Sequence, residues 1–544
     1  MYRIHQIKLD LGESKEKLPE KISKKIGVRD LPIKKWRIVK ESIDARNKAN
    51  IKLVYSVDFE TDRKLKLEES PQRKYEIPKV APEISEAISS EKPLSEERKL
   101  LRPVVAGFGP AGIFASLILA QAGLRPIILE RGRDVERRAY DVESFWQGGP
   151  LDTESNVQFG EGGAGAFSDG KLTTGIKDIR IEKVFGELIN FGAPAEISYK
   201  QKPHIGTDVL RMTVKNMREE ILRLGAEIFF ETKLTDLILS EEKLDGIICE
   251  NRKGERRRIM CRHLILAPGH SARDTFSMLR ERKIAMERKP FSIGVRIEHP
   301  QEMIDISQYG KPHGELGLPP AEYKLSYRCR EKCENETIEC AASEGKAAGR
   351  GVYTFCMCPG GQVINASSEN GGVVVNGMSF HARDSGIANS ALLCDVRTED
   401  FNGDDILAGV EFQRQYERKA YEAAGFKPAP PTTSWGLLRD GKAADVEACL
   451  PEFALEAFRE AMPELGKKLK GFDSESAKIY AVETRSSSPV RILRRKDGQS
   501  LSAAGLYPCG EGAGYAGGIT SAAVDGIKMA EAVIEDMQKK EDYV

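Results

Sequence analysis

Hydrophobic and polar residues alternate at the start of the chain in a pattern that predicts a small folded unit. Residues 2–9 alternate with a period of two, as a strand with one buried face does. Residues 16–26 carry apolar side chains at helical spacing, and residues 33–39 and 51–59 have the pattern of two further strands. This β-α-β-β order, with a turn or helix before the last strand, predicts a small α+β (ferredoxin-like) domain over residues 1–70.

The pattern changes twice after residue 70. Residues 71–100 hold four prolines in a charged stretch, which predicts an extended linker. From residue 101 the signals are those of an α/β protein. An apolar strand at 104–106 leads through a glycine-rich turn into a helix at 111–122, and a second strand follows at 126–129. These elements form one βαβ unit.

Composition limits the possible classes of protein. The chain has 544 residues, of which 40% are hydrophobic and 31% charged, and its formal net charge is zero. A length of this kind predicts several domains with buried cores, and the balanced charge argues against a protein built to coat nucleic acid. The uncharged stretch 103–124 is long enough to cross a bilayer, but its glycines and proline divide it into a strand, a turn and a helix. With no signal peptide, we expect a soluble cytoplasmic protein with ten reduced cysteines.

The glycine-rich turn has the sequence GFGPAG and matches the dinucleotide-binding pattern G-x-G-x-x-G. Gly107 permits the tight turn, Gly109 allows a pyrophosphate to approach the backbone, and Gly112 allows the helix to pack closely on the strand. The helix that follows Pro110 offers free N–H groups at its start, from Ala111 on, and these favour a phosphate. Glu130 ends the second strand, where a carboxylate accepts hydrogen bonds from ribose hydroxyls and repels a 2′-phosphate.

Three further glycine-rich segments indicate FAD rather than NAD as the bound dinucleotide. They are GEGGAGAFSDGK at 160–171, LILAPGH at 264–270 and GEGAGYAGGI at 510–519, the last followed by a helix. Each predicts backbone that lies close to a flat or charged group. Near residue 233 we expect backbone beside the adenine, and at Glu511 a contact with a ribityl hydroxyl. The residues predicted to contact FAD are Gly107, Gly109, Pro110, Ala111, Gly112, Glu130, Arg131, Gly163, Gly165, Ala166, Ser168, Asp169, Lys233, Leu234, Ala267, Pro268, Gly269, Gly510, Glu511, Gly517, Gly518 and Ile519.

These segments define a domain layout. A Rossmann-like FAD-binding domain with three layers spans residues 101–282 and is completed by 476–544, and an α+β substrate domain is inserted at 283–475. The chain lacks a second G-x-G-x-x-G in a strand–turn–helix context. We therefore expect no separate nicotinamide domain, and any NAD(P)H binds transiently at the flavin.

The motifs together resemble those of the glutathione-reductase-like FAD-binding superfamily. More narrowly, GEGGAGAFSDGK, FCMCPGG at 355–361, ETRSSSPVR at 483–491 and GEGAGYAGG make the chain similar to bacterial FAD-dependent dehydrogenases described as NAD-utilising. The resemblance covers nearly the whole chain and implies FAD binding and a redox role. It implies no particular substrate.

Several polar residues near these segments are candidates for contact with a small-molecule substrate. They are His270, His381, Arg383 and Arg485, where the arginines suit an anionic group. Structural histidines and interdomain ion pairs are the alternative interpretations. Cys356 and Cys358 are interpreted as packing thiols, with a dithiol that reacts with the flavin as the alternative. The cysteine spacings do not match those of structural zinc sites, so no metal is expected.

The leading functional hypothesis is an oxidoreductase that transfers hydride between FAD and an organic substrate. Two other classes remain open on the sequence. The mildly basic residues 1–70 would serve a flavin-dependent protein that binds or modifies RNA, although they lack the aromatic platform for stacked bases. A redox-sensing flavoprotein without turnover is the third class.

Overall fold

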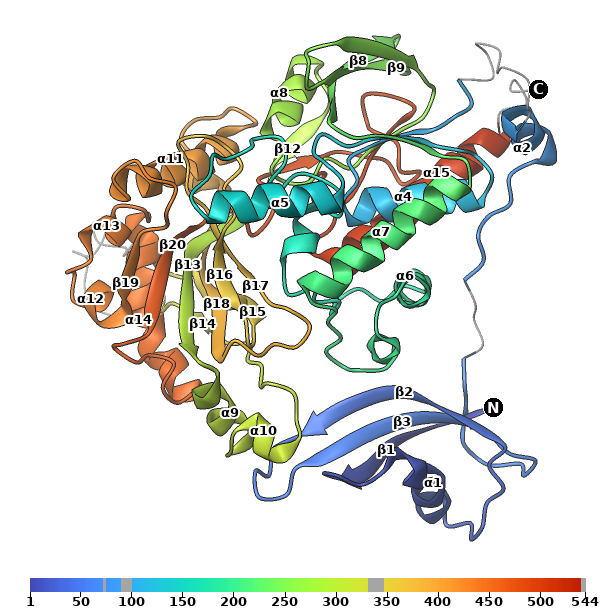
Figure 1. Cartoon of the computed structure of the whole chain (residues 1–544), viewed down its shortest axis with the longest axis vertical. Coiled ribbons are helices and arrows are strands. Elements are labelled where there is room, and N and C mark those ends of the chain that lie inside the picture. The colour runs from blue at the N-terminus through green and yellow to red at the C-terminus, as the bar shows by residue number, and fades with distance from the viewer. Residues whose placement is uncertain (72–74, 90–99, 331–346, 540–544) are drawn as a thin grey trace, which may run out of the picture.

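A parallel five-stranded sheet forms the centre of the computed structural model, which describes residues 1–71, 75–89, 100–330 and 347–539 (Figure 1). The strand order is β22-β11-β5-β6-β7. The strands are β5 (Val104–Ala106), β6 (Ile127–Leu129), β7 (Glu227–Phe229), β11 (Leu264–Leu266) and β22 (Leu506–Pro508). They are short and almost wholly apolar, as expected of parallel strands that are covered on both faces.

Alternate residues of these strands enter two different cores, which produces three layers. Val105, Ile128 and Ile265 pack against the helical layer. That layer contains α4 (Pro110–Gln121), α6 (Arg180–Asn190), α7 (Thr207–Arg223) and α15 (Ile519–Lys539). Val104 and Leu266 face the opposite way, onto a three-stranded antiparallel sheet. Its strands are β8 (Thr232–Ser240), β9 (Lys243–Asn251) and β10 (Arg256–Met260). The predicted three-layer Rossmann-like fold is confirmed.

A six-stranded antiparallel sheet forms the second large unit, in the order β14-β15-β18-β13-β20-β19. Its strands are β13 (Phe291–Pro300), β14 (Ser326–Arg328), β15 (Gly351–Cys358), β18 (Ile387–Val396), β19 (Thr432–Ser434) and β20 (Lys478–Glu483). The helices of this unit are α9 (Gln301–Tyr309), α10 (His313–Leu316), α11 (Ala408–Ala423), α12 (Trp435–Arg439), α13 (Ala444–Glu447) and α14 (Glu452–Lys468). The strand pair β16 (Gln362–Asn365) and β17 (Val375–Met378) also belongs to it.

Short elements connect the two large units. Strand β12 (Met286–Arg288) pairs with β21 (Val490–Ile492). The segment that leads into the six-stranded unit therefore lies beside the segment that leads out of it. Helices α5 (Val135–Trp146) and α8 (Arg273–Glu281) lie in the first unit, and a 3₁₀ turn covers Gly163–Phe167. The parallel sheet thus receives its last strand from residues that follow the six-stranded sheet in the sequence.

The N-terminal residues form a four-stranded antiparallel sheet in the order β2-β3-β1-β4, with α1 (Leu18–Ile26) packed against it. Its strands are β1 (Tyr2–Asp10), β2 (Lys35–Asp44), β3 (Lys52–Glu60) and β4 (Glu68–Glu69). The predicted β-α-β-β order is present, and a turn connects β2 to β3. Figure 1 shows this sheet in blue beneath the other two units. The backbone of Glu41 hydrogen bonds with Tyr199 and Gln201, and Lys48 donates to the carbonyl of Ser307.

The prediction of an extended linker over residues 71–100 is wrong for its central part. Residues Pro82–Ser89 form helix α2, and Ile84 and Ile88 are buried in the same core as α4 and α15. Ile84 and Ile88 stand at helical spacing, and Pro82 occupies the first helical position, which tolerates proline, so the prolines of this stretch do not exclude a helix. Residues 72–74 and 90–99 lie outside the described part of the chain.

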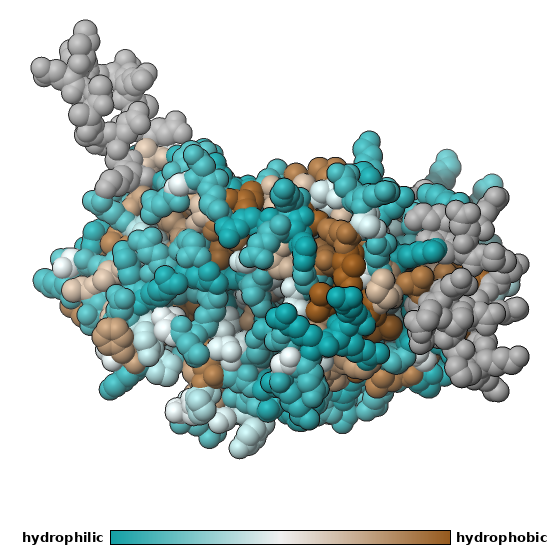
Figure 2. All heavy atoms as spheres, turned by 90° about the horizontal axis from the view of Figure 1, so that it is seen from above, coloured by the Kyte–Doolittle hydropathy of each residue, from teal (hydrophilic) through white to brown (hydrophobic). Residues whose placement is uncertain are grey.

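The surface is largely polar. Figure 2 shows one face on which hydrophilic residues predominate and hydrophobic residues are visible between them. Among the described residues, no helix combines the length and the hydropathy needed to span a membrane.

Candidate functional site

One cavity of about 340 Å³ lies at the carboxyl ends of β5, β6 and β11 and is lined by residues from all four glycine-rich segments. Segments from distant parts of the sequence, with lining residues as far apart as Gly107 and Ile519, therefore meet around a single space. In open α/β sheets, ligands bind at this edge of the sheet.

The turn at 107–112 is built so that side chains are excluded from it. Gly107 has a φ of 99°, which glycine adopts readily. A Cβ at Gly112 would lie 1.8 Å from the Gly107 carbonyl oxygen, so the helix reaches the strand only without a side chain there. Gly109 precedes α4 and lines the cavity, with Pro110 at the first helical position. The start of α4 thus offers free N–H groups to the cavity.

Glu130 organises the backbone around this turn. Its carboxylate accepts hydrogen bonds from the N–H groups of Phe108 at 2.8 Å, Gly132 at 2.9 Å and Gly160 at 3.0 Å. The side chain is buried and lines the cavity. The residue expected to bind ribose therefore also holds together two of the glycine segments.

The segment 160–171 packs directly on the first turn. Gly162 donates to the Phe108 carbonyl at 2.9 Å, and a Cβ on Gly109 would lie 3.6 Å from the Cα of Gly163. The hydroxyl of Ser168 donates to the Gly165 carbonyl at 2.8 Å. This packing brings the backbone of the segment to the cavity beside the start of α4.

The opposite end of the cavity is lined by Thr232, Lys233 and Leu234. Beside them, the guanidinium of Arg131 hydrogen bonds to Glu154 at 2.8 Å and to Asp274. It also lies 4.2 Å from the centre of the Phe159 ring. This end thus combines an aromatic ring with a paired arginine.

The segment 510–519 leads into α15, the longest helix in the described residues. Gly517 and Gly518 line the cavity, and a Cβ on either would meet no protein atom within 4 Å. The N–H of Gly510 donates to Asp525 at 2.8 Å, which fixes the loop on its own helix. Bare backbone at a helix N-terminus is a favourable place for an anionic group.

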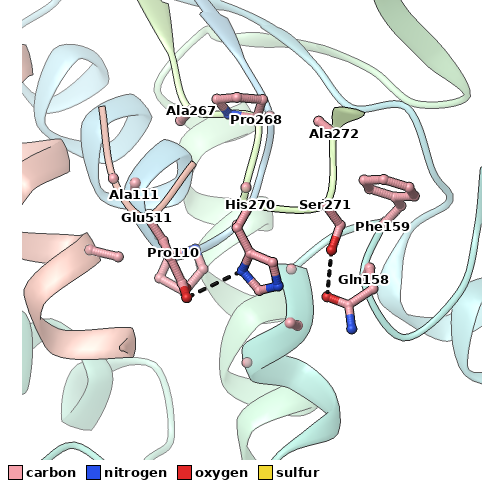
Figure 3. A pocket seen from close by; sticks show the side chains of 18 of the residues that line it. Pro110, Ala111, Gln158, Phe159, Ala267, Pro268, His270, Ser271, Ala272 and Glu511 are labelled. Carbon is pink, nitrogen blue, oxygen red and sulfur yellow. Dashed lines mark hydrogen bonds and ion pairs between the residues drawn. The ribbon is translucent and has the colours of Figure 1, made fainter. Parts of the chain in front are cut away.

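His270 and Glu511 meet across the cavity, as Figure 3 shows. The His270 Nδ1 atom lies 3.2 Å from a carboxylate oxygen of Glu511. The His270 side chain is 10% exposed, and no hydrogen-bond partner for its Nε2 atom is found among the described residues. Next to this pair, Ser271 donates to Gln158 at 3.1 Å. The imidazole therefore keeps one nitrogen available to a ligand.

Most predicted site residues line the cavity, and four do not. Those that do not are Gly112, Ala166, His381 and Arg383. Gly112 lies beneath the turn, where it permits close packing, and the Ala166 carbonyl accepts a hydrogen bond from Thr207. The prediction of cofactor or substrate contact at these four positions is not supported by their location.

The two predicted arginines are both committed to buried ion pairs. Arg383 pairs with Asp169 and Glu322, while His381 stacks on the ring of His204. Arg485 lines the cavity, but its guanidinium bonds to both carboxylate oxygens of Glu417. Arg485 follows β20 and Glu417 lies on α11, so this ion pair lies within the six-stranded unit, and the pair that joins the two units is the one between Glu417 and Arg273 of α8.

The six-stranded unit supplies a further wall that the sequence did not assign to the site. Phe355 and Cys356 of β15, Asn376 of β17 and Glu483 of β20 line the cavity, and so does Lys171. Arg296 of β13 lies behind this wall and is fully buried. Two features of the sequence point to this wall: the motif FCMCPGG, and the position of Lys171 directly after the glycine loop. Other lining residues that were missed are Ala106, Phe108, Leu129, Gln158, Phe159, Gly160, Ala164, Thr173, Thr232, Leu266, Ser271, Ala272, Thr275, Ser486, Cys509 and Ala522.

Two side chains of this wall, Cys356 and Glu483, have shifted pKa values. The neighbouring Cys358 thiol, with the nearby charges of Lys171 and Arg296, lowers the pKa of Cys356 below that of an ordinary thiol. Burial raises the pKa of Glu483 to about 7, although Arg296 opposes that change. Perturbed groups in a cleft are typical of functional sites. Among the described residues, no group of His, Cys, Asp or Glu is arranged to hold a metal ion.

Comparison with known proteins identifies the class to which this chain belongs. Residues 290–437 and 436–486 match a family described as "FAD-dependent protein, C-terminal domain-like", and residues 1–60 match a domain of unknown function. An uncharacterised protein from Clostridium beijerinckii is 46% identical over 551 residues, which cover 98% of both chains. The chain belongs to the same family as this clostridial protein, and its residues 290–486 match the C-terminal domain model of FAD-dependent proteins.

Solved structures with partial similarity include three flavoproteins. The flavin-dependent brominase Bmp2 is 12% identical, with a TM-score of 0.38, and the match covers 81% of this chain and 80% of that one. A flavoprotein/dehydrogenase from Cytophaga hutchinsonii is 13% identical, with a TM-score of 0.36 and coverage of 81% and 79%. A glycerol-3-phosphate dehydrogenase from Bacillus halodurans in complex with FAD is 13% identical, with a TM-score of 0.33 and coverage of 84% and 66%.

Proposed function

We propose that the protein is an FAD-dependent oxidoreductase that transfers hydride between FAD and a small organic substrate. The observation that carries this proposal is the single cavity around which all four glycine-rich segments meet. A long dinucleotide needs backbone contacts at several separated points, and these segments supply them from four parts of the chain.

The residues around the cavity fit FAD. The start of α4 at Gly109 suits the pyrophosphate, and Glu130 suits the ribose of the ADP half. Lys233 and Leu234 suit the adenine at the far end of the cavity. Gly517 and Gly518 leave open backbone at the start of α15, which suits the flavin half. We propose that the predicted contact residues that line the cavity, which are all of the 22 except Gly112 and Ala166, hold FAD.

When bound, FAD supplies the hydride chemistry, and the chain's own side chains position the reacting groups. The positive end of α15 favours negative charge on a reduced flavin. His270, with one ring nitrogen available and the other beside Glu511, is suited to hold or pass a proton. Arg485 binds Glu417 at the wall of the cavity, and Glu417 also binds Arg273 of α8 in the first unit. The substrate then occupies the part of the cavity that Phe355 and Glu483 line.

The finer family assignment also belongs to this proposal. The motifs resemble those of the glutathione-reductase-like superfamily, and the chain has a single dinucleotide turn. We propose that reduced nicotinamide, NADH or NADPH, binds only transiently at the flavin.

A visible absorption spectrum of the purified chain tests the proposal. We expect flavin bands, or their appearance on addition of FAD, and bleaching by NADH or NADPH. Gly109→Val places a branched side chain where the pyrophosphate is proposed, and it is expected to abolish FAD binding while the protein stays folded. Gly314→Val, at a position with no neighbour within 4 Å, is the matched control. Wild-type protein that is folded but binds no FAD would falsify the proposal.

A further inference from the structure

Two cysteines with different surroundings lie at the wall that the six-stranded sheet contributes to the cavity. Cys356 lines the cavity and is partly exposed, whereas Cys358 is completely buried. The pairing of β15 with β18 slips by one residue between Phe355 and Cys358, which is a β-bulge. Bulges are common next to active sites, where they change the direction of a side chain.

The backbone at Cys356 is held in an unusual conformation. Its φ is 43°, in the left-handed region that residues with a side chain seldom adopt. A residue held in this region carries backbone strain, and residues of this kind are concentrated at functional sites. Arg296 donates to the Cys356 carbonyl at 2.9 Å and also binds the Glu483 carboxylate. The fold therefore keeps this thiol in place at an energetic cost.

The charges around Cys356 favour its ionised form. Lys171 and Arg296 are the cations that act on it, and Asp169 acts in the opposite sense while lying 3.1 Å from the Lys171 ammonium. The Cys358 thiol donates a hydrogen bond to the Cys356 carbonyl oxygen at 3.2 Å, and the interaction between the two thiols lowers the pKa of Cys356 and raises that of Cys358. One thiolate thus faces the cavity and one neutral thiol stands behind it, as in an attacking and a resolving cysteine.

We propose that Cys356 and Cys358 form a redox-active dithiol that reduces a small organic disulfide bound in the cavity. The Cys356 thiolate attacks one sulfur of the substrate, the substrate S–S bond breaks, and the leaving thiolate takes a proton from water. Cys358 then attacks the Cys356 sulfur and loses its proton to the second thiolate. One substrate disulfide gains two electrons and two protons, and a Cys356–Cys358 disulfide forms.

This inference rests on the proposed function for one step only. Two electrons and one proton reopen the Cys356–Cys358 disulfide to one thiolate and one thiol, and reduced flavin in the same cavity is the donor. The exchange between the dithiol and the substrate is complete without the flavin. It can therefore be measured separately from FAD binding.

Mass spectrometry of the full-length protein after treatment with bis(2-hydroxyethyl) disulfide tests the inference. Wild-type protein is expected to lose two thiols and to yield a peptide with Cys356 linked to Cys358. Cys358→Ser is expected to keep the mixed disulfide on Cys356, because the resolving thiol is missing. Cys394→Ser removes a buried thiol of β18 outside the cavity and is expected to behave like the wild type.

Alkylation of the wild type with iodoacetamide as a function of pH gives a second readout that needs no variant. Cys356 is expected to react in neutral and mildly acidic buffer, well below the pH at which an ordinary thiol reacts. Lys171→Met removes a neighbouring cation and is expected to move this profile to higher pH. Folding of each variant is checked by circular dichroism.

The outcomes separate this inference from the proposed function. Protein that binds FAD but leaves both cysteines as thiols, or a folded Cys358→Ser variant that traps no mixed disulfide, overturns the dithiol. Protein that forms the Cys356–Cys358 disulfide but binds no FAD overturns the proposed function and leaves the exchange chemistry intact.

Discussion

The carboxylate of Glu130 accepts a hydrogen bond of 2.8 Å from the backbone N–H of Phe108, in the middle of the glycine turn. The same carboxylate holds the N–H of Gly160, so it fixes two of the glycine segments against each other. Glu130, which the sequence predicts to bind ribose, therefore also stabilises the fold. The first prediction follows from this double role.

Glu130→Gln is expected to destabilise the fold and to weaken FAD binding. The amide keeps one acceptor but loses the charge, and hydrogen bonds to charged groups contribute roughly 1.5–3 kcal/mol each. We expect a loss of about 2–4 kcal/mol in the free energy of unfolding, measured with urea. Glu250→Gln removes an exposed partner of Arg256 and is the control, with less than about 1 kcal/mol expected. Equal stability of the two variants would contradict the role given to Glu130.

Gly112→Ala and Gly186→Ala are expected to change stability in opposite directions. At Gly112 the new methyl group would meet the Gly107 carbonyl at 1.8 Å, so the helix must move away from the strand. Overpacking of this kind costs about 1–3 kcal/mol. Gly186 lies in α6 with no neighbour within 4 Å, and alanine there is expected to add about 0.5–1 kcal/mol. Thermal unfolding of both variants checks the sign of each change.

Gly518→Ala is expected to leave the protein without cofactor unchanged and to weaken its affinity for FAD. The methyl group meets no protein atom, so the free energy of unfolding should change by less than about 0.5 kcal/mol. If the flavin half packs on this backbone, the dissociation constant for FAD rises about tenfold, or 1.4 kcal/mol. Titration followed by flavin fluorescence measures it, with Gly314→Ala as control. An unchanged affinity would move the flavin away from the start of α15.

Asp169→Asn is expected to remove one of the two carboxylates that neutralise the buried Arg383 and to leave Glu322 as its remaining partner. Removal of one partner from a buried ion pair costs about 3–5 kcal/mol. The wild type should also show a characteristic dependence on pH. Burial opposes ionisation of Asp169, but Lys171 and Arg383 outweigh it and lower its pKa to about 2.

Because the pKa in the folded state is below the ordinary value, the ionised carboxylate stabilises the fold above about pH 4. This stabilisation is lost as the pH falls from about 4 to about 2, and it amounts to about 2 kcal/mol. Urea unfolding across this range measures it. Asp169→Asn should lack this pH-dependent stabilisation, and Asp440→Asn, at an exposed ion pair, should retain it. A variant at Asp169 with the wild-type pH profile would contradict the prediction.

The sequence predicted those parts of the fold and site whose signals are local. The βαβ unit, the glycine turn and Glu130 lie within about 30 residues, and periodicity and glycine spacing report them directly. The wall formed by Cys356, Asn376 and Glu483 depends on which strands of the six-stranded sheet lie side by side, and no local pattern encodes that order. Arg383 illustrates the same limit, because its buried partner Asp169 lies 214 residues away.

The origin of β22 and α15 at residues 506–539 has a consequence for the order of events during synthesis. Strand β22 pairs with β11, and a Cβ at Gly526 of α15 would lie 2.1 Å from the Ala111 carbonyl of α4. The ribosome therefore completes the whole six-stranded unit before the cavity can close. Until the final strand and helix emerge, the nascent chain exposes the apolar face of α4, and cofactor loading has to follow translation of nearly the entire chain.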